Sequence, residues 1–328
     1  MIRSVLSRSI WFGALAALLG AGVANADTWR FANAASPGDR AETAALRLIE
    51  IVNQKLNGRH KIEYFGSSSL GGERELTEGV KIGTIDFGMT STSAMTTFVP
   101  QLAFYDMPFL FRDVAHARRV ATGAVGDKLL VAMETAGIKG LATAESGFRN
   151  MITNKTAINK PADMSGLKIR VIESPSHIAA IRAMGASAVP IAFPEVYGSL
   201  QQGVVDGLDL PIGNITPYKL YEVVKFVSLT EHIYTPHVFI MNLDVFKKLS
   251  PQDQAVIVSA AKEAADLERK INDDLVVQWT NELKAKGMNV VPVSVQEKAA
   301  FAERMKPVWA QFEGRIGKGV IEEAIAAP

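Results

Sequence analysis

The stretch LKIRVIESPSHIAAIRAMG, residues 167–185, carries the signals that decide the fold. Its first six residues alternate as in a half-buried strand, with Leu167, Ile169 and Val171 on one face and Lys168, Arg170 and Ile172 on the other. Ser174 and Pro175 suit the N-cap and first turn of a helix, and Gly185 suits its end. The stretch therefore predicts a strand followed by a helix, with Arg170 close to the junction.

The residues that follow repeat this pattern. Residues 188–193 form a short extended segment, and a helix then begins at Pro194 and ends at Gly203. Two successive strand-to-helix junctions bring two helix N-termini to the same region. Because these ends carry free N–H groups and a partial positive charge, the region suits an anion.

The first half of the chain shows the same order. Strands are predicted over residues 28–32, 60–65 and 84–89. A helix with Ser36 as its cap and Pro37 in its first turn runs to Gly58, and a second helix spans 73–82. Strands that alternate with helices favour a mainly parallel sheet covered by helices.

A long helix is predicted near the C-terminus, where Ser250 caps, Pro251 starts and Gly287 stops an unbroken segment. At 1.5 Å per residue such a helix spans on the order of 50 Å, longer than one lobe of about 150 residues. About 300 residues favour two lobes, and this helix is long enough to bridge them.

The first residues predict export. Arg3 and Arg8 precede an apolar run over 10–23, and Ala24, Asn25 and Ala26 form a small-x-small cleavage site. The alternative is a membrane anchor, but spanning a bilayer takes about 20 apolar residues. We therefore expect residues 1–26 to be a signal peptide and the remainder, which has no long apolar run, to be soluble in the periplasm.

Composition excludes several classes of function. Without Arg3 and Arg8 the chain has 33 basic and 34 acidic residues, a net charge of −1, so nucleic acid is not expected as a partner. The absence of cysteine excludes thiol chemistry and cysteine-based metal sites. His232 and His237 are poorly spaced for a metal, so we expect neither a metal nor a cofactor.

Enzyme signatures are also missing. The chain has no Gly-x-Ser-x-Gly elbow, no phosphate-binding glycine loop and no dinucleotide-binding glycine pattern. Catalytic groups are defined by geometry and not by motif, so a hydrolase or lyase that uses Glu73 or Glu173 stays open at this point. Arg149 and Arg170 are candidates for binding a carboxylate through the planar guanidinium, the alternative being exposed surface charge.

Longer motifs point to one family. The chain contains PADMSGLKIRV, the run GASAVPIAFPEVYGSLQQGVVDG at residues 185–207, and YEVVKFVSLTEHIYTPHVF. It also contains SSSLGGERELTEGVKIGTIDFGMTSTS and YDMPFLF. With these motifs the chain resembles the solute-binding proteins of tripartite ATP-independent periplasmic (TRAP) transporters, of the dicarboxylate-binding type, over nearly all of its length after residue 26.

The resemblance implies an α/β, two-lobed periplasmic binding protein fold. Each lobe is a mixed, mainly parallel sheet flanked by helices, and a long helix bridges the lobes. We expect residues 27–147 with about 235–275 in the first lobe and residues 148–234 with about 276–328 in the second. Such a receptor captures an organic acid in the cleft and delivers it to a permease with a small and a large membrane subunit. A receptor for sensing or for an ATP-driven importer is a further alternative.

The resemblance also implies site residues. The arginine of the LKIRV strand, here Arg170, pairs with the ligand carboxylate, and Arg149 faces the cleft. Further expected positions are Asn33, Glu73, Ser91, Thr92, with Ser93 nearby, Glu173, Phe193 and His237.

One position departs from the pattern of the family. Many members have an amide where this chain has Leu210, so Asp209 or Asn214 would have to substitute for it. Leu210 favours a monocarboxylate, for which an apolar or aromatic tail is one option, whereas a second arginine favours a dicarboxylate. The sequence leaves these two ligands unranked.

Overall fold

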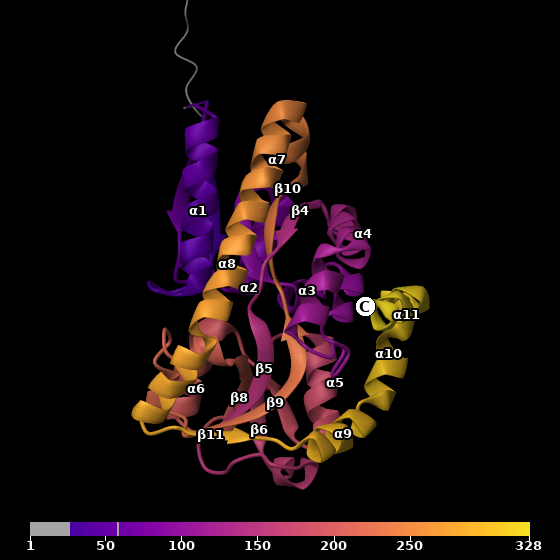
Figure 1. Ribbon diagram of the computed structural model, residues 1–328. Helices are drawn as coiled ribbons and strands as arrows, with labels where there is room; N and C mark the ends of the chain where they lie inside the picture. Colours follow the sequence, from indigo (N-terminus) through magenta and orange to yellow (C-terminus); the bar gives the residue numbers. More distant parts are fainter. Residues whose placement is uncertain (1–26, 58) are drawn as a thin grey trace, which may run out of the picture.

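The computed structural model describes residues 27–57 and 59–328, which form two β-sheets flanked by helices (Figure 1). The predicted signal peptide, residues 1–26, lies outside the described residues. The first sheet has the strand order β2-β1-β3-β10-β4 and the second has β11-β9-β5-β8-β6-β7. The strands are β1 Asp27–Asn33, β2 His60–Phe65, β3 Phe87–Ser91, β4 Ile138–Thr143, β5 Gly147–Thr153, β6 Lys168–Val171, β7 Ser187–Pro190, β8 Gly207–Pro211, β9 Phe226–Thr235, β10 His237–Asn242 and β11 Asn289–Pro292.

Both sheets are mixed. In the first sheet β1 pairs in parallel with β2 and β3, and β10 pairs antiparallel with β3 and β4. In the second sheet β11–β9, β6–β7 and β6–β8 are parallel, whereas β5 pairs antiparallel with β8 and β9. The predicted α/β class with mixed sheets is confirmed, but only the second sheet has more parallel than antiparallel pairings, three against two, whereas the first has two of each.

The chain passes between the sheets at neighbouring places. β4 of the first sheet leads through residues 144–146 into β5 of the second, and β9 of the second leads through Pro236 into β10 of the first. Ala144 N donates to His237 O at 2.7 Å and Ser146 N donates to Thr235 O at 3.1 Å, so the two crossings are hydrogen-bonded to each other. Side chains at the crossings therefore lie where the two sheets meet.

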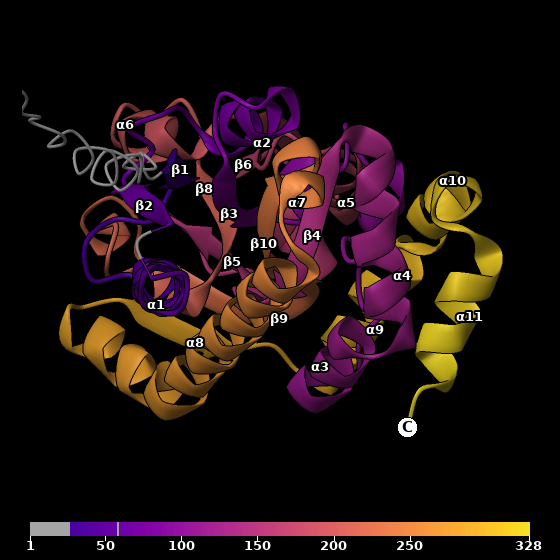
Figure 2. The same ribbon diagram turned by 90° about the horizontal axis from the view of Figure 1, so that it is seen from above.

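Helix α8, Pro251–Ala285, confirms the long helix predicted from the sequence. Ser250 accepts a hydrogen bond from Asp253 N, as expected of its N-cap. The helix packs on α1 and β4 of the first lobe and farther on against β11 and the short turn η6, Ile212–Asn214, of the second (Figures 1 and 2). It therefore bridges the lobes.

Helix α1, Arg40–Lys55, begins later than predicted, so the assignment of Ser36 as the cap was wrong. Asp39 N donates to Ser36 O at 3.0 Å, and Gly38 has a φ of 85°, so residues 36–39 form a turn. The Asp39 carboxylate then accepts from Ala41 N and caps the helix. The predicted end of this helix, Gly58, lies outside the described residues. Strand β3 likewise begins at Phe87 and not at residue 84, because residues 83–86 form a turn after α2.

The remaining helices cover the sheets and then wrap back over them. They are α2 Glu73–Ile82, α3 Val114–Thr122, α4 Ala124–Ala132, α5 Pro175–Met184, α6 Val196–Gln201, α7 Leu243–Lys248, α9 Val295–Arg304, α10 Lys306–Ile316 and α11 Lys318–Ala326. The last three run from the second lobe along α5 towards α4 of the first lobe (Figure 1). One apolar cluster accordingly joins the lobes, and it includes Phe104, Ile181 and Phe312.

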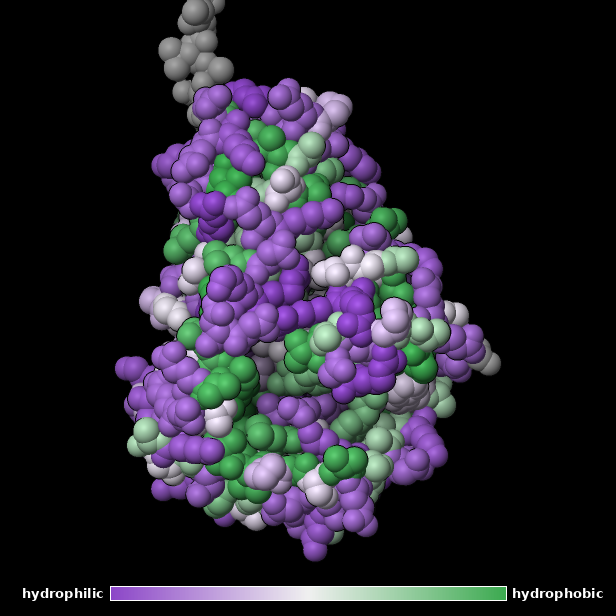
Figure 3. All heavy atoms as spheres, in the orientation of Figure 1, coloured by the Kyte–Doolittle hydropathy of each residue, from purple (hydrophilic) through white to green (hydrophobic). Residues whose placement is uncertain are grey.

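The surface is mainly hydrophilic on the face shown in Figure 3, with patches of hydrophobic residues between the hydrophilic ones. Within residues 27–57 and 59–328, no helix is long and apolar enough to span a membrane.

Candidate functional site

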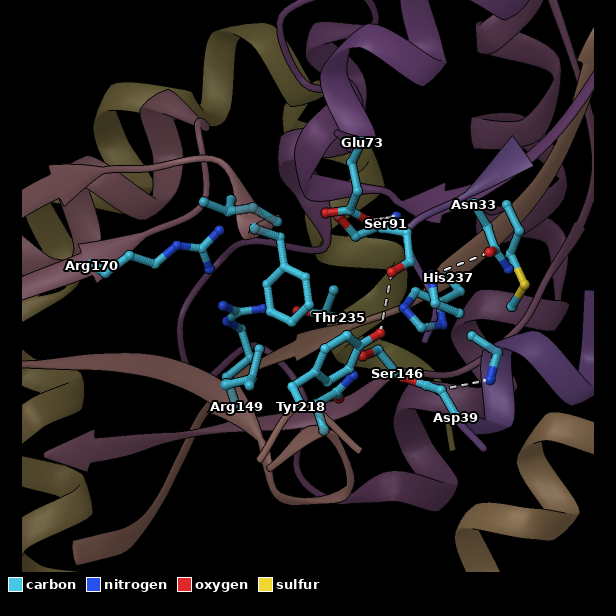
Figure 4. A pocket seen from close by; sticks show the side chains of 18 residues that line it. Asn33, Asp39, Glu73, Ser91, Ser146, Arg149, Arg170, Tyr218, Thr235 and His237 are labelled. Atoms are coloured by element: carbon cyan, nitrogen blue, oxygen red, sulfur yellow. Dashed lines mark hydrogen bonds between the residues drawn. The ribbon is translucent and has the colours of Figure 1, made fainter. Parts of the chain in front are cut away.

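A pocket lies between the two sheets, beside the chain crossings (Figure 4). Nine of the twelve predicted site residues line it: Asn33, Glu73, Ser91, Arg149, Arg170, Phe193, Leu210, Asn214 and His237. They come from β1, α2, β3, β5, β6, β8, β10 and the turns after β7 and β8. The pocket therefore draws side chains from both lobes.

Arg170 lies at one end of the pocket with Arg149 beside it (Figure 4). Its side chain is among the largest fully buried ones, with 1% of its surface exposed. Nε donates to Ile191 O at 2.9 Å, and Cζ lies 5.7 Å from the centre of the Phe193 ring. Among the described residues, no carboxylate forms an ion pair with this guanidinium. Burial, and then the charge of Arg149, lowers the pKa of Arg170 to about 10.

Arg149 is held differently. Its Nε donates to Asp209 Oδ2 at 2.6 Å, and its Nη2 donates to Asp209 O and to Asp209 Oδ1. Asp209 points away from the pocket, where His177 Nδ1 lies 3.3 Å and His232 Nε2 3.5 Å from its Oδ2. Burial acts to raise the pKa of Asp209, but Arg149 and the two histidines outweigh it, so the pKa lies well below its usual range. Arg149 thus lines the pocket and also forms a buried salt bridge.

Glu73 begins α2 and lies across the pocket from the arginines. Its Oε1 accepts from Ser91 N at 2.7 Å and its Oε2 accepts from Ser91 Oγ at 3.1 Å, so the carboxylate is fixed at the end of β3. Thr92 does not line the pocket, because its hydroxyl lies 3.5 Å from Pro236 O, and Ser93 donates to Asp106. Of the three successive hydroxyl residues at the end of β3, Ser91 is the one that faces the pocket.

Other predicted residues complete the pocket or lie behind it. Phe193 packs edge-on against Tyr218 with the ring centres 4.6 Å apart, and Asn214 Oδ1 accepts from Arg40 at 2.9 Å. Asp209 lies behind Arg149 and not in the lining. Glu173 lines a smaller neighbouring hollow that also includes Arg170.

Sequence reasoning missed several lining residues, above all Asp39, Ser146, Tyr218 and Thr235. The Tyr218 hydroxyl accepts from Ser36 N at 3.3 Å and lies 3.4 Å from Ala34 O, which joins the lobes. Burial and then Asp39 raise the pKa of Tyr218 well above its usual value. Tyr218 lies in irregular chain with no periodic pattern, so no local signal marks it.

The helix N-terminus at Pro175 does not face a free anion site. Asp106, which is fully buried, fills this place instead. It accepts from Ser174 Oγ at 3.0 Å and from Ser176 Oγ, and His177 Nε2 lies 3.2 Å from its Oδ1. The anion that the sequence predicts at this helix end is therefore a carboxylate of the protein.

Among residues 27–57 and 59–328, no group of three or more His, Cys, Asp or Glu side chains could hold a metal ion.

Two α/β lobes with a pocket between them that is lined by buried arginines and carboxylates are typical of the class of two-lobed solute-binding proteins. A family model described as bacterial extracellular solute-binding protein, family 7, matches residues 31–315. The chain belongs to this family.

Relatives and solved structures agree with this assignment. A solute-binding protein of Verminephrobacter eiseniae is 41% identical over 276 residues, 84% of this chain and 82% of the relative. The 2,3-diketo-L-gulonate-binding periplasmic protein YiaO of Escherichia coli is 35% identical over 290 residues, 88% of each chain. A TRAP periplasmic solute-binding protein of Polaromonas, solved with D-erythronate, is 37% identical with a TM-score of 0.89, covering 92% of this chain and 99% of that one.

The predicted family, fold and receptor role are thereby confirmed. The family and its structural neighbours are solute-binding transport proteins and not enzymes, which rejects the hydrolase or lyase alternative.

Proposed function

We propose that this protein is the periplasmic receptor of a TRAP permease and that its ligand is a monocarboxylate with several hydroxyl groups. The carboxylate binds Arg170, with Arg149 beside it, and the hydroxyls bind the opposite wall. The lobes, residues 27–147 with about 235–275 and residues 148–234 with about 276–328, close on the ligand. The closed form then docks on the small and large membrane subunits.

The observation that carries this proposal is a set of buried polar atoms in the lining. Asp39 Oδ2, Asn33 Nδ2 and Thr235 Oγ1 are buried and have no hydrogen-bond partner among the described residues. Buried polar atoms are nearly always hydrogen-bonded, because an unpaired one costs about 1–3 kcal/mol. Hydroxyl groups both donate and accept, so a polyol chain suits this mixture of atoms.

The charges in the lining support one carboxylate and not two. Arg149 is already paired with Asp209, so Arg170 is the guanidinium whose charge a ligand would balance. The other wall carries the carboxylates of Asp39 and Glu73, which would repel a second carboxylate and accept hydroxyl protons. Two relatives are linked to acids of this kind: the Escherichia coli protein is named for 2,3-diketo-L-gulonate, and the Polaromonas structure contains D-erythronate, whereas a Sulfurospirillum structure contains succinate.

A thermal-shift screen tests the ligand class. The purified protein is heated with D-erythronate and other aldonates, hexuronates, succinate and benzoate, each at millimolar concentration. Because a ligand at 100 times its Kd stabilises by about 2.7 kcal/mol, micromolar binders give clear shifts. We expect sugar acids to shift the melting temperature most. A larger shift with succinate would favour a dicarboxylate, and a larger shift with benzoate would favour an aromatic tail.

The partner is tested by transport. Proteoliposomes that contain the cognate small and large membrane subunits should take up the radiolabelled ligand only when this protein is present. Uptake through an ATP-driven importer instead would contradict the assignment to a TRAP permease.

A further inference from the structure

Helix α8 places a carboxylate behind the pocket. Glu268 is fully buried and does not line the pocket itself. Its Oε1 lies 2.9 Å from His237 Nδ1, and its Oε2 accepts from Glu145 N, at the crossing between β4 and β5, at 3.0 Å. Arg40 Nε is 4.0 Å from Oε1. Glutamate is rarely fully buried unless it is paired, so this position calls for an explanation.

His237 is the residue that Glu268 connects to the pocket. It begins β10, lies opposite Ser91 in the pairing with β3, and lines the pocket (Figure 4). Its side chain is 14% exposed, and Nδ1 is held by the Glu268 carboxylate. An imidazolium donates from both ring nitrogens, so a proton on Nδ1 that is shared with Glu268 leaves Nε2–H as the second donor of the ring.

The groups around His237 favour the charged ring. Burial acts to lower the pKa of His237, but Glu268 outweighs it, so the pKa lies above its usual value. Arg40 from α1 lowers the pKa of His237, and Glu73 from α2 raises it together with Glu268. The other charged side chains of the lining are Asp39, Arg149 and Arg170.

We propose that Glu268 is a positioning residue that keeps His237 as an imidazolium directed at the pocket, so that ligand binding is linked to a proton. The helix that bridges the lobes thereby sets the pH dependence of binding. This inference rests on the proposed function, because it places the ligand beside His237.

The direction in which affinity changes with pH follows from the positive charge of the His237 imidazolium. An anionic or hydroxylated ligand stabilises the imidazolium, so binding raises the pKa of His237 further above that of the free protein. Affinity is therefore constant at pH values below the pKa of the free protein and falls as the pH rises between the two pKa values. The slope for one linked proton is at most about tenfold per pH unit.

Calorimetric titration with D-erythronate from pH 5.5 to 9 tests the linkage. For the unmodified protein we expect Kd to rise with pH. In Glu268→Gln the rise in Kd should begin at lower pH, and the affinity should approach that of the unmodified protein at pH 5.5. In His237→Gln the Kd should not change with pH. Glu263→Gln removes a carboxylate from the exposed side of the same helix, where it pairs with Arg47, and should leave the profile unchanged.

A loss of affinity in Glu268→Gln that is equal at every pH would overturn the proposal, since it would show a merely structural role. So would a flat profile for the unmodified protein.

A second measurement needs no ligand. Titration of the imidazole C–H resonances by NMR, with His237→Gln identifying the signal among five histidines, should give a pKa above the ordinary value and a lower one in Glu268→Gln. An ordinary or lower pKa in the unmodified protein would reject the positioning role, even if Glu268→Gln did not fold. If D-erythronate did not bind at any pH, the proposed ligand class would be in doubt, and the NMR result would still decide the role of Glu268.

Discussion

Arg149 and Arg170 occupy neighbouring places in the same pocket, yet their surroundings differ. Both are buried, with 2% and 1% of their surface exposed. Arg149 forms a salt bridge with Asp209, whose other neighbours are His177 and His232. Arg170 has a backbone carbonyl and an aromatic ring beside it, and no carboxylate partner among the described residues.

The difference separates a charge that the folded protein balances from one that, as we propose, a ligand balances. A buried ion loses several kcal/mol of hydration, and a partner of opposite charge restores part of this loss. For Arg149 that partner is built into β8. For Arg170, burial and the charge of Arg149 lower the pKa to about 10, so the guanidinium stays charged at neutral pH but at a cost in free energy relative to water, which a bound carboxylate would offset.

The largest effect should come from breaking the balanced pair. Asp209→Ala leaves Arg149 buried and unpaired, and we expect the free energy of unfolding to fall by about 3–5 kcal/mol. Urea denaturation of the unliganded protein measures this change. Arg170→Met is the matched comparison, because it removes a buried charge that has no partner, and its stability should be unchanged or higher. A large destabilisation by Arg170→Met would show that the two arginines do not differ in this way.

The next largest effect concerns affinity. Arg170→Ala should weaken binding of the ligand by about 2–5 kcal/mol, or about 30-fold or more, because the buried carboxylate loses its partner. Arg170→Lys should also be damaging, since the planar guanidinium is lost. Calorimetric titration measures both variants, and Lys168→Ala, an exposed position on the same strand, is the control. Near-normal affinity in Arg170→Ala would remove Arg170 from the ligand site.

This contrast also marks the limit of what the sequence could predict. The alternation in residues 167–172 and the helix signals after it predicted β6 and α5, and the motifs predicted Arg170, because these are local or family-wide patterns. Asp209, the partner of Arg149, was predicted as a substitute for the missing amide in ligand binding. Nothing in the spacing of residues 149 and 209 shows that their strands pair. The register between β5 and β8 brings Asp209 next to Arg149, and this register is a property of the assembled sheet.

The same reason explains the other misses. Tyr218, Asp39 and Glu268 come from a turn, a helix cap and the middle of a long helix, and only the packing of the lobes brings them near the pocket. At the N-terminus of α5, where the sequence predicted a bound anion, the structure has the Asp106 carboxylate. A helix N-terminus favours a negative charge, but the local sequence does not show whether a ligand or the protein supplies it.

A moderate effect should come from the wall opposite the arginines. Glu73→Gln keeps the shape of the side chain but removes the charge that accepts from Ser91. We expect a hydroxylated monocarboxylate to bind about 5- to 30-fold more weakly, the cost of about 1–2 kcal/mol for weakened hydrogen bonds. Succinate should bind better to this variant than to the unmodified protein, because one repelling carboxylate is gone. Calorimetric titration with both acids checks the prediction, and weaker succinate binding would contradict it.

The smallest effect should be a pH dependence of stability from the charges behind Arg149. Burial acts to lower the pKa of His177, but Asp106 and Asp209 outweigh it, so the pKa is raised. Burial likewise acts to raise the pKa of Asp106, but His177 and two serine hydroxyls outweigh it, so that pKa is lowered. A raised histidine pKa stabilises fully below the unfolded value of about 6.5 and is lost as the pH rises through the folded value, whereas a lowered aspartate pKa stabilises above about 4.

From His177 and Asp106 alone, stability should be greatest between about pH 4 and 6.5 and decline towards pH 9, whereas the lowered pKa of the buried His232 reduces stability below about pH 6.5 and leaves the decline above it unchanged. For one group we expect a change on the order of 1 kcal/mol, or about 2 °C in melting temperature for a chain of this size. Melting curves at fixed ionic strength measure it. His177→Gln isolates this group from His237, whose pKa is also raised, and it should reduce the decline between pH 6.5 and 9. If the variant kept the full decline, the positive charge of His177 would not stabilise the buried carboxylates of Asp106 and Asp209. The contrast between the paired Arg149 and the unpaired Arg170 would then rest on the salt bridge between Arg149 and Asp209 alone.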